Sequence, residues 1–557
     1  MSLFDSASLV VTPNGTKASK LYAIKPTDGS GDLVVTRATT ATRVNSDGLI
    51  EQVPYNLLQR SEEFNNAIWG KKSVTITANS VIAPNNTLTA DTFTTSSVNA
   101  TIDQNVTFQN PCTFSIYVKY IDSQFIQLYA GISSQSRANF DILNGVVGDR
   151  GTDTSNSTIE SVGNGWYKLT VTFINNSGVE KIRVKFVASL TSGWGVASTN
   201  AINSAYLWGA QLVTGTSAKE YFPTTDRLNV PRLDYTNSSC PSILVEPQRT
   251  NLALYSEDLN NANWNKVNSI TVDSNASVAP DGNTTADRLN AIITASVLRQ
   301  FVNVTAGQTV TFSCYIKKSI GSPTTKIRIE DQLIPYGNNN IDVVATNTWQ
   351  KISVTRTVGL GVTQVSIDIF PDINSNGSVF IWGAQLEAGA YPTSYIPTVA
   401  SSVTRNADVI SKTGISSLIG QTNGVVFLEI GEVKNNGATG AEVWYFEMRK
   451  DQNNSFGLAS AGGTPQPIRF VTKIAGAVTT ESEAAPFGNS KIAIKYTDTQ
   501  FKFFINGTLL YTVSKSIGGY ADIEFMESAS VNLLMILKKF LIFPSALSDA
   551  DCISLTT

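Results

Sequence analysis

The chain contains no histidine, and this absence narrows the chemistry open to it. Histidine is the commonest general base and the usual zinc ligand, so Ser-His-Asp, Cys-His and histidine–zinc sites are excluded. The 4 cysteines are far apart in the 557 residues, and none forms a Cys-x-x-Cys pair. We therefore expect single thiols in hydrophobic cores rather than disulfides, and we expect no bound metal or cofactor.

Charge and long apolar runs are also scarce. Asp, Glu, Lys and Arg make up 15% of the residues, against about 25% in an average soluble protein. The formal net charge of -3 gives no basic surface for nucleic acid or for a membrane. The richest apolar run, residues 531–543, contains two lysines and is shorter than the roughly 18 residues of a membrane span. The first residues lack a signal-peptide pattern, so we expect synthesis in a cytoplasm and no membrane insertion.

Uncharged polar residues and glycine are abundant instead. Ser, Thr, Asn and Gly favour strands and turns over helices. A chain of this length is expected to form several domains of roughly 100–200 residues each. The composition therefore predicts an all-β protein with more than one domain.

A duplicated sequence organises the chain. Residues 205–212 read Ala-Tyr-Leu-Trp-Gly-Ala-Gln-Leu, and residues 379–386 repeat them as Val-Phe-Ile-Trp-Gly-Ala-Gln-Leu. The first copy begins at Asn56 and the second at Asn251, 195 residues later, whereas Trp208 and Trp382 are 174 residues apart. The second copy is thus shorter by 21 residues, which we interpret as lost loop.

Each copy has the period-two alternation of half-buried strands, as in residues 113–119. We predict two tandem antiparallel jelly-roll sandwiches, residues 56–224 and 251–398. The connector, residues 225–250, is too hydrophobic for a flexible linker. We expect it to pack on residues 1–55 and to complete an N-terminal β platform that serves for attachment.

Residues 399–557 form a last domain with a different pattern. Asn506-Gly507 between two alternating runs predicts a tight hairpin. Ser548, followed by acidic residues, predicts the N-cap of a short terminal helix. A hairpin is also predicted in the opening segment, around Asp47-Gly48.

The closing domain resembles the laminin-G/concanavalin-like sandwich, through residues 503–510 and 540–551. The two copies resemble the jelly-roll carbohydrate-binding-type modules of tailed-bacteriophage fibre and tail proteins. The resemblance lies in the opening Asn-Leu-Leu…Ser-Glu-x-Phe…Trp, the closing Trp-Gly-Ala-Gln-Leu, and residues 38–51 of the opening segment.

This resemblance implies a structural and adhesive virion protein of the head or tail. It would dock to capsid or tail proteins through its N-terminal region and present its sandwiches to host-surface or mucus glycans. A homotrimer, made in the host cytoplasm, is the usual state of such fibres. A glycan depolymerase and a ligand-free architectural spacer are the alternatives.

The eight tryptophans fall into two groups. Two have no counterpart in the other copy: Trp194 in a Gly-flanked loop, and Trp444 followed by Tyr445. These three aromatic side chains are the candidates for stacking on a sugar, with loop packing or a subunit contact as the alternative. The other six occupy matched positions, which indicates framework: Trp69 and Trp264, Trp166 and Trp349, Trp208 and Trp382.

Paired acids recur at Glu62-Glu63 and Glu257-Asp258. A glycosidase needs two carboxylates that face each other across a sugar, about 5–10 Å apart, which adjacent residues on one segment rarely do. A serine before each pair fits a capped helical turn better. We therefore assign no catalytic residue and do not expect an enzyme.

Overall fold

The computed structural model of the chain describes residues 3–17, 20–53, 56–108, 111–131, 134–176, 178–225, 229–236, 238–331, 339–374, 377–435, 443–460, 467–484, 489–525 and 533–557. These residues form antiparallel sheets almost throughout, which confirms the predicted all-β class. The chain divides into two compact units, residues 53–227 and residues 1–52 with 228–557. The segment boundaries given above stay a prediction.

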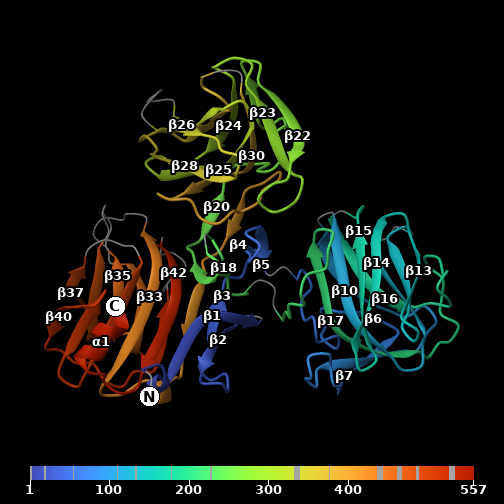
Figure 1. Ribbon diagram of the computed structural model, residues 1–557, viewed down its shortest axis with the longest axis horizontal. Helices are drawn as coiled ribbons and strands as arrows, with labels where there is room; N and C mark the ends of the chain where they lie inside the picture. The colour runs from blue at the N-terminus through green and yellow to red at the C-terminus, as the bar shows by residue number, and fades with distance from the viewer. Residues whose placement is uncertain are drawn as a thin grey trace. The chain divides into compact units, whose positions relative to one another are not determined.

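Module 1, residues 56–224, is a two-sheet sandwich, coloured blue to green in Figure 1. Its strands are β6 (Gly70–Lys72), β7 (Val74–Val81), β8 (Ala90–Thr95), β9 (Thr101–Phe108), β10 (Cys112–Tyr120), β11 (Phe125–Ala130), β12 (Arg137–Asp141), β13 (Val146–Arg150), β14 (Thr154–Gly163), β15 (Trp166–Phe173), β16 (Gly178–Phe186) and β17 (Ser204–Thr214). One sheet has the order β14-β15-β10-β17-β8-β7 and the other β13-β12-β11-β16-β9-β6. The chain crosses repeatedly between the two sheets, as in a jelly roll, and the apolar sides of the central strands face the shared core.

Module 2, residues 251–398, repeats this arrangement. Its strands are β21 (Asn265–Val267), β22 (Thr271–Ser277), β23 (Ala286–Asn290), β24 (Val297–Asn303), β25 (Thr309–Ile320), β26 (Thr324–Asp331), β27 (Asn340–Val344), β28 (Gln350–Thr357), β29 (Gln364–Phe370) and β30 (Ser378–Ala388). The sheets have the orders β22-β23-β30-β25-β28 and β21-β24-β29-β26-β27.

The interpretation of the shorter second copy as lost loop is wrong in part. Phe114 and Phe312 are 198 residues apart, but Trp166 and Trp349 only 183, so most of the loss falls between these landmarks. In module 1 this interval contains β13 and β14, which have no counterpart among the strands described in module 2. Each is the edge strand of a different sheet, so both can be removed without opening the core.

The third sheet has 16 strands and joins the two ends of the chain. Its strands are β1 (Leu9–Lys17), β2 (Lys20–Lys25), β3 (Leu33–Thr36), β18 (Leu233–Asp234), β19 (Ser242–Val245), β32 (Val409–Lys412), β33 (Gly424–Asn435), β34 (Val443–Asp451), β35 (Asn454–Ser460), β36 (Ile468–Ile474), β37 (Ala477–Ala484), β38 (Ser490–Tyr496), β39 (Phe501–Ile505), β40 (Thr508–Val513), β41 (Asp522–Phe525) and β42 (Leu533–Phe543). Blue β1 lies beside red β42 in Figure 1, with Val10 opposite Leu541. The opening segment thus contributes strands to the closing sandwich.

Short elements complete the fold. They are β4 (Ala41–Val44), β5 (Ile50–Val53), β20 (Arg249–Asn251), β31 (Val403–Arg405), two 3-10 turns, η1 (Leu3–Ser6) and η2 (Ser416–Leu418), and the helix α1 (Asp549–Thr556). Three local predictions are confirmed: the β4–β5 hairpin, the β39–β40 hairpin with Asn506 and Gly507 at positive φ, and Ser548 as a capping-box N-cap. None of the described helices is long and apolar enough to cross a membrane.

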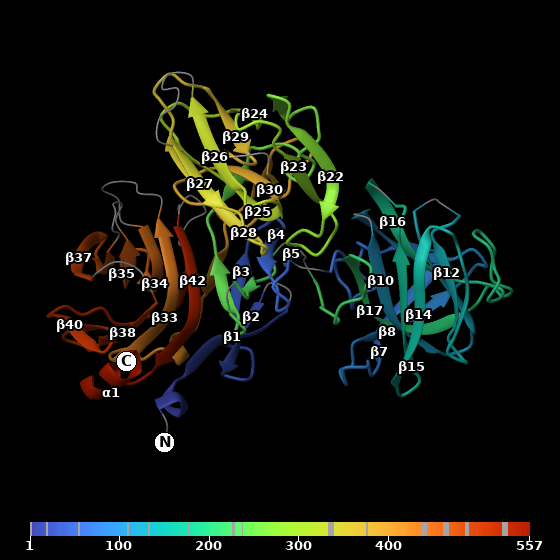
Figure 2. The same ribbon diagram turned by 45° about the horizontal axis from the view of Figure 1, so that its top comes forward.

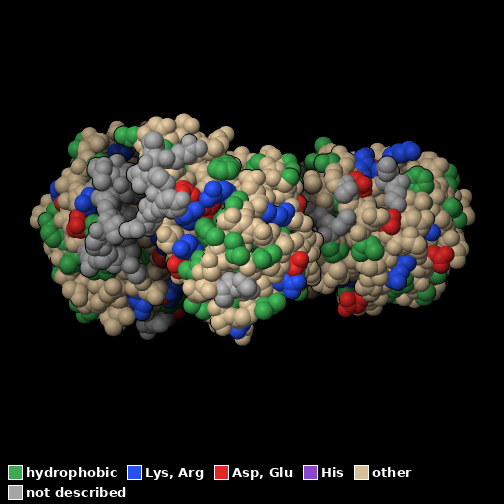
Figure 3. All heavy atoms as spheres, turned by 90° about the horizontal axis from the view of Figure 1, so that it is seen from above, with side chains coloured by type: hydrophobic (Ala, Val, Ile, Leu, Met, Phe, Trp, Pro, Cys, Tyr) green, Lys and Arg blue, Asp and Glu red, His purple; other side chains and the backbone are tan. Residues whose placement is uncertain are grey.

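Three cysteines, Cys112, Cys314 and Cys552, are buried as expected, but Cys240 is exposed, so the prediction of core thiols is wrong there. On the face shown in Figure 3, charged side chains are scattered over a surface that is mostly polar or backbone. Among the atoms drawn in colour, the few charged residues of the chain are thus not gathered into one dense region on that face.

A buried cluster of charged side chains joins three segments of the larger unit: the opening segment, the connector and the entry to the last domain. Arg232 Nη1 lies 2.7 Å from Glu246 Oε2, and Arg232 Nη2 bonds Asp408 Oδ2. Arg37 Nη1 lies 2.7 Å from Asp408 Oδ1, and Arg405 Nη1 lies 2.7 Å from Glu246 Oε2. All five side chains are at most 2% exposed.

Burial alone would raise the pKa of Asp408, but the guanidinium groups of Arg232, Arg37 and Arg405 outweigh it and hold the pKa below its usual range. The pKa of Glu246 is lowered in the same way by Arg405 and Arg232. Both carboxylates are therefore charged in the folded state at neutral pH.

Removing one anion from this cluster should destabilise the larger unit strongly. Asp408→Asn leaves buried guanidinium charge uncompensated, which costs about 3–5 kcal/mol. We expect calorimetry to show a lower unfolding transition for residues 1–52 with 228–557 and an unchanged one for residues 53–227. The control is Glu432→Gln, which breaks a 3.0 Å pair with Lys434 whose side chains are more than two-fifths exposed. Glu432→Gln should lower the free energy of unfolding by no more than about 0.5 kcal/mol.

The same carboxylates predict acid sensitivity. Their folded pKa values lie below the unfolded values near 4, so their contribution is present above about pH 4 and is lost as pH falls. Asp408→Asn should flatten this acid dependence in pH-resolved thermal unfolding of the larger unit. If the unfolding temperature of the variant falls with decreasing pH as steeply as that of the parent chain, the acid dependence does not come from Asp408.

Candidate functional site

The module 1 sheet with the order β13-β12-β11-β16-β9-β6 presents a polar surface on the side away from the core. Ile126, Leu128, Ile182, Val184 and Ile102 point into the core. Because successive side chains of a strand point to opposite faces, the residues between them form the outer surface. We call the outward side chains of β12, β11, β16, β9 and β6 the module 1 outer face.

Strand register fixes which side chains are neighbours on this face. Arg137 lies opposite Tyr129, Tyr129 opposite Arg183, and Arg183 opposite Asp103, so these four form one row. A second row contains Asn139, Gln127 and Lys185. Lys72, opposite Thr101, lies at the end of this row, and Lys181 lies beside the first row, opposite Asn105.

The loop that carries Trp194 lies over the second row. Asn139 Nδ2 donates to the carbonyls of Leu190 and Ser192 at 2.9 and 2.8 Å. Lys185 Nζ donates to the carbonyl of Val196 at 2.7 Å. Gln127 Nε2 donates to the Ser192 carbonyl at 3.4 Å, and all three donor side chains are buried.

Trp194 itself is 47% exposed. Its ring is thus presented to solvent by a loop that buried hydrogen bonds hold in place. Sequence analysis selected Trp194 for its glycine neighbours, but could not place it beside the polar rows.

The face also carries charged side chains. Lys181 Nζ lies 2.7 Å from Asp103 Oδ1, and the Lys181 side chain is 41% exposed. The guanidinium of Arg183 lies 5.3 Å from the centroid of the Tyr129 ring and donates to the Gly131 carbonyl. Burial, with the charge of Lys72, lowers the pKa of Lys185. Sequence analysis missed these residues, because polar positions alternating in β11 and β16 do not reveal which strands are neighbours.

The equivalent face of module 2 has different chemistry. Arg299 and Arg328 both bond Asp368, whose side chain is fully buried, and both bond Glu330, at 3.1 and 2.8 Å. Phe301, on the same face, is 51% exposed. Among the described residues of module 2, this face has neither a counterpart of Trp194 nor a surplus of positive charge.

The paired tryptophans occupy matching positions in the two modules. Trp208 contacts Tyr221 at 4.6 Å between ring centroids, and Trp382 contacts Tyr395 at 4.4 Å. These clusters lie outside the main sandwich cores, on the other sheet. In module 2 the β4–β5 hairpin packs there through Ile50 (Figure 2).

Trp69 and Trp264 lie in the sandwich cores, where each indole donates to a backbone carbonyl, at 3.0 and 3.3 Å. Trp166 is buried, whereas Trp349 is partly exposed, with Lys317 Nζ 4.8 Å from its ring centroid.

Trp444 and Tyr445 lie on β34 of the closing sandwich. Trp444 is 8% exposed and Tyr445 is fully buried. Neither ring is presented to solvent as Trp194 is, so burial favours Trp194 among the three aromatic candidates.

The paired acids do not begin capped helices, and that interpretation was wrong. Ser61 and Ser256 each accept from the backbone of a distant threonine, Thr224 and Thr398, both at 2.8 Å. These serines therefore close the end of each module onto its beginning. The acidic residues next to them, Glu62 and Glu257, accept from Tyr221 and Tyr395 at 3.2 and 2.9 Å.

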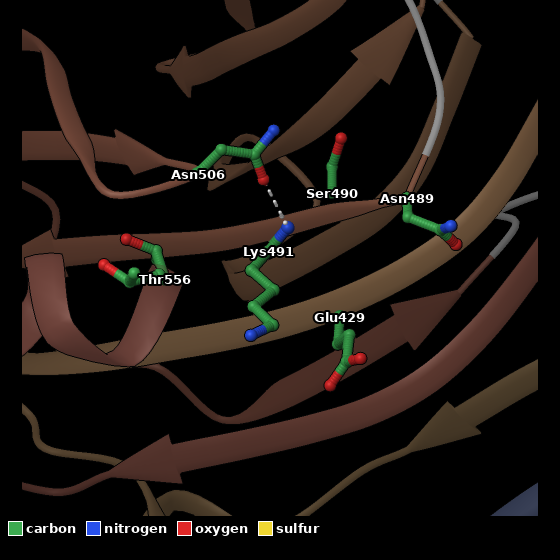
Figure 4. Close-up of a pocket in the computed structure, with 7 residues that line it drawn as sticks. Glu429, Asn489, Ser490, Lys491, Asn506 and Thr556 are labelled. Carbon is green, nitrogen blue, oxygen red and sulfur yellow. Dashed lines mark hydrogen bonds between the residues drawn. The ribbon is translucent and has the colours of Figure 1, made fainter.

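The closing sandwich has a shallow pocket (Figure 4). Its volume is about 230 Å³, and its described lining is Glu429, Asn489, Ser490, Lys491, Asn506, Thr556 and Thr557. Asn506 Oδ1 accepts from the Lys491 backbone at 2.9 Å, and Asn489 Oδ1 accepts from Lys538 at 2.8 Å. The described lining has no aromatic ring for a sugar to stack on, and within the described residues no group of acids and cysteines is placed to hold a metal ion.

Modules 1 and 2 are thus jelly-roll sandwiches, each with one outward polar sheet face. No known family model matches the chain, and no curated protein matches it in sequence.

Some solved structures are similar to parts of it. The receptor-binding domain of botulinum neurotoxin mosaic serotype C/D is 18% identical over 26% of this chain and 38% of its own, with a TM-score of 0.22. The tandem CBM22 domains of Xyn10C from Paenibacillus barcinonensis are 14% identical over 60% of this chain and 97% of theirs, at 0.20. Domain 4 of the arabinanase AbnA from Geobacillus stearothermophilus is 13% identical over 30% of this chain and 82% of its own, at 0.23. Likeness this low carries no argument about activity.

The Glu257 carboxyl gives a pH prediction. Burial raises its pKa to about 7, against the lowering effect of the Tyr395 hydrogen bond. The unfolded state ionises near pH 4, so folding loses stability as pH rises from about 4 to about 7. Glu257→Gln should therefore stabilise the larger unit by up to about 3 kcal/mol at pH 8 and leave it nearly unchanged near pH 4. Thermal unfolding at the two pH values measures this, with Asp258→Asn at the exposed neighbouring position as the control.

Proposed function

We propose that this chain is a structural and adhesive protein that binds glycans at the module 1 outer face. The observation that carries the proposal is the exposed Trp194 ring, held by a loop that three buried side chains fix. An indole offers a flat apolar surface for the face of a sugar ring. A preorganised loop reduces the entropy that binding would otherwise cost.

The rows beside the loop supply the polar contacts that a sugar needs. Arg137, Arg183 and Asp103 lie in the row beside the one that the Trp194 loop covers, and together with Lys181 they offer donors and acceptors. A single face of this size is suited to weak binding, and several copies of the chain would raise the avidity.

We further propose that the chain is part of a tailed-bacteriophage virion, in which it docks through its N-terminal region and forms a homotrimer. The support is the sequence resemblance of the repeats and of residues 38–51 to fibre and tail proteins. Mass spectrometry of purified particles should detect the chain, and light scattering should give three times its mass. A monomer, or particles without the chain, would contradict this role.

Trp194→Ala should weaken glycan binding by at least about tenfold, since losing a central aromatic contact costs more than about 1.4 kcal/mol. The full-length chain is screened on a glycan array, and the best ligand is then measured by calorimetry. The control is Ile202→Ala, an exposed apolar residue (70%) between the same two strands, which should leave affinity unchanged.

Three outcomes would speak against the proposal. Equal binding by the Trp194 variant would place the site elsewhere. Absence of binding by the native oligomer would favour the architectural spacer. Release of reducing sugar from a bound polysaccharide would favour the depolymerase.

A further inference from the structure

The two outer faces differ in charge, although they share one strand arrangement. In module 1 the two rows and Lys181 contain five cations and one carboxylate: Arg137, Arg183, Lys185, Lys72 and Lys181 against Asp103. Asp141, the next outward residue of β12, adds a second carboxylate to the face, and this one accepts from Gln124 and from the backbone of Leu143 and Asn144. In module 2 the corresponding rows contain three cations and three carboxylates: Arg299, Arg328 and Lys326 against Asp368, Glu330 and Asp342.

The difference includes a reversal of sign at the centre of the face. Arg183 of β16 lies opposite Asp103 of β9, whereas Asp368 of β29 lies opposite Arg299 of β24. In module 2, Asp368 receives two guanidinium groups and the network is neutral. In module 1, the single carboxylate of Asp103 is already paired with Lys181, so the other cations have no carboxylate partner within these rows.

We propose that the module 1 outer face takes an anionic glycan, one that carries carboxylate or sulfate groups. This rests on the proposed glycan-binding function and names its ligand class. Trp194 stacks on a sugar ring, while Arg183, Lys181 and Lys72 receive the acidic groups of the same chain. The planar fork of a guanidinium suits bidentate contact with a carboxylate or sulfate.

Strand spacing sets how the charges can be used. Neighbouring strands lie about 4.8 Å apart, so cations on β16 and β6, two strands apart, can meet successive acidic groups of an extended chain. Lys185 has a different task, because its ammonium donates to the Val196 carbonyl and holds the Trp194 loop. Substitution of Lys185 would therefore disturb the loop rather than test the charge.

The test uses the full-length chain and two probes with one backbone: an oligogalacturonate and its fully methyl-esterified, neutral form. A heparin-derived oligosaccharide tests a chain that carries sulfate in addition to carboxylate. We expect the acidic probes to bind and the neutral form to bind at least about tenfold more weakly. Affinity for the acidic probes should fall as NaCl rises from about 0.05 M to about 0.5 M.

Charge-neutral variants assign the binding to the face. Arg183→Gln with Lys181→Gln should weaken the acidic probes at least about tenfold and reduce the salt dependence. Lys326→Gln, the matched lysine removal on module 2, should leave both unchanged. Circular dichroism and thermal unfolding confirm that each variant is folded.

The outcomes separate this proposal from the one it rests on. Trp194-dependent binding that is equal for acidic and neutral probes would overturn the anionic preference and leave the glycan-binding function standing. If no oligosaccharide on the array or among these probes binds in a Trp194-dependent way, both fail. Acidic binding that survives Arg183→Gln with Lys181→Gln would also overturn it.

Discussion

The larger unit depends on one buried electrostatic cluster. Arg37, Arg232, Arg405, Glu246 and Asp408 come from the opening segment, the connector and the entry to the last domain. Glu246 also accepts from the backbone and hydroxyl of Ser394, at the end of module 2. Buried charges are tolerated only when paired, so these segments must come together in one arrangement. The cluster thus fixes module 2, the connector and the terminal sheet to one another.

The modules illustrate how a β-sandwich separates stability from recognition. Inward side chains such as Ile182 and Ile367 keep the same apolar character in both copies. Outward side chains on the same strands differ in charge, as Arg183 and Asp368 do. Since alternate residues of a strand point to opposite faces, one set can change while the other preserves the core.

Local patterns predicted local structure well. The Asn506-Gly507 turn, the Ser548 N-cap and the jelly-roll strands follow from signals a few residues long, and all are present. Predictions about residues that contact a segment far away in the sequence were less accurate. The sequence around Ser61 resembles an N-cap. In the structure, however, the Ser61 hydroxyl accepts from the backbone of Thr224, and this bond joins the end of the module to its beginning. Counterparts of β13 and β14 do not occur among the described strands of module 2, and the sequence shows this difference only as a change of spacing, which a lost loop would also produce.

The sequence by itself determined the all-β class, the duplication and the choice of Trp194 as a candidate, because periodicity, repetition and glycine neighbours are local properties. Only the tertiary structure decided that Tyr445 is buried, that buried donors hold the loop of Trp194, and that five cations share one face with Asp103. Sheet register places residues from β6 to β16 side by side, and register is set by long-range pairing that no short stretch of sequence records.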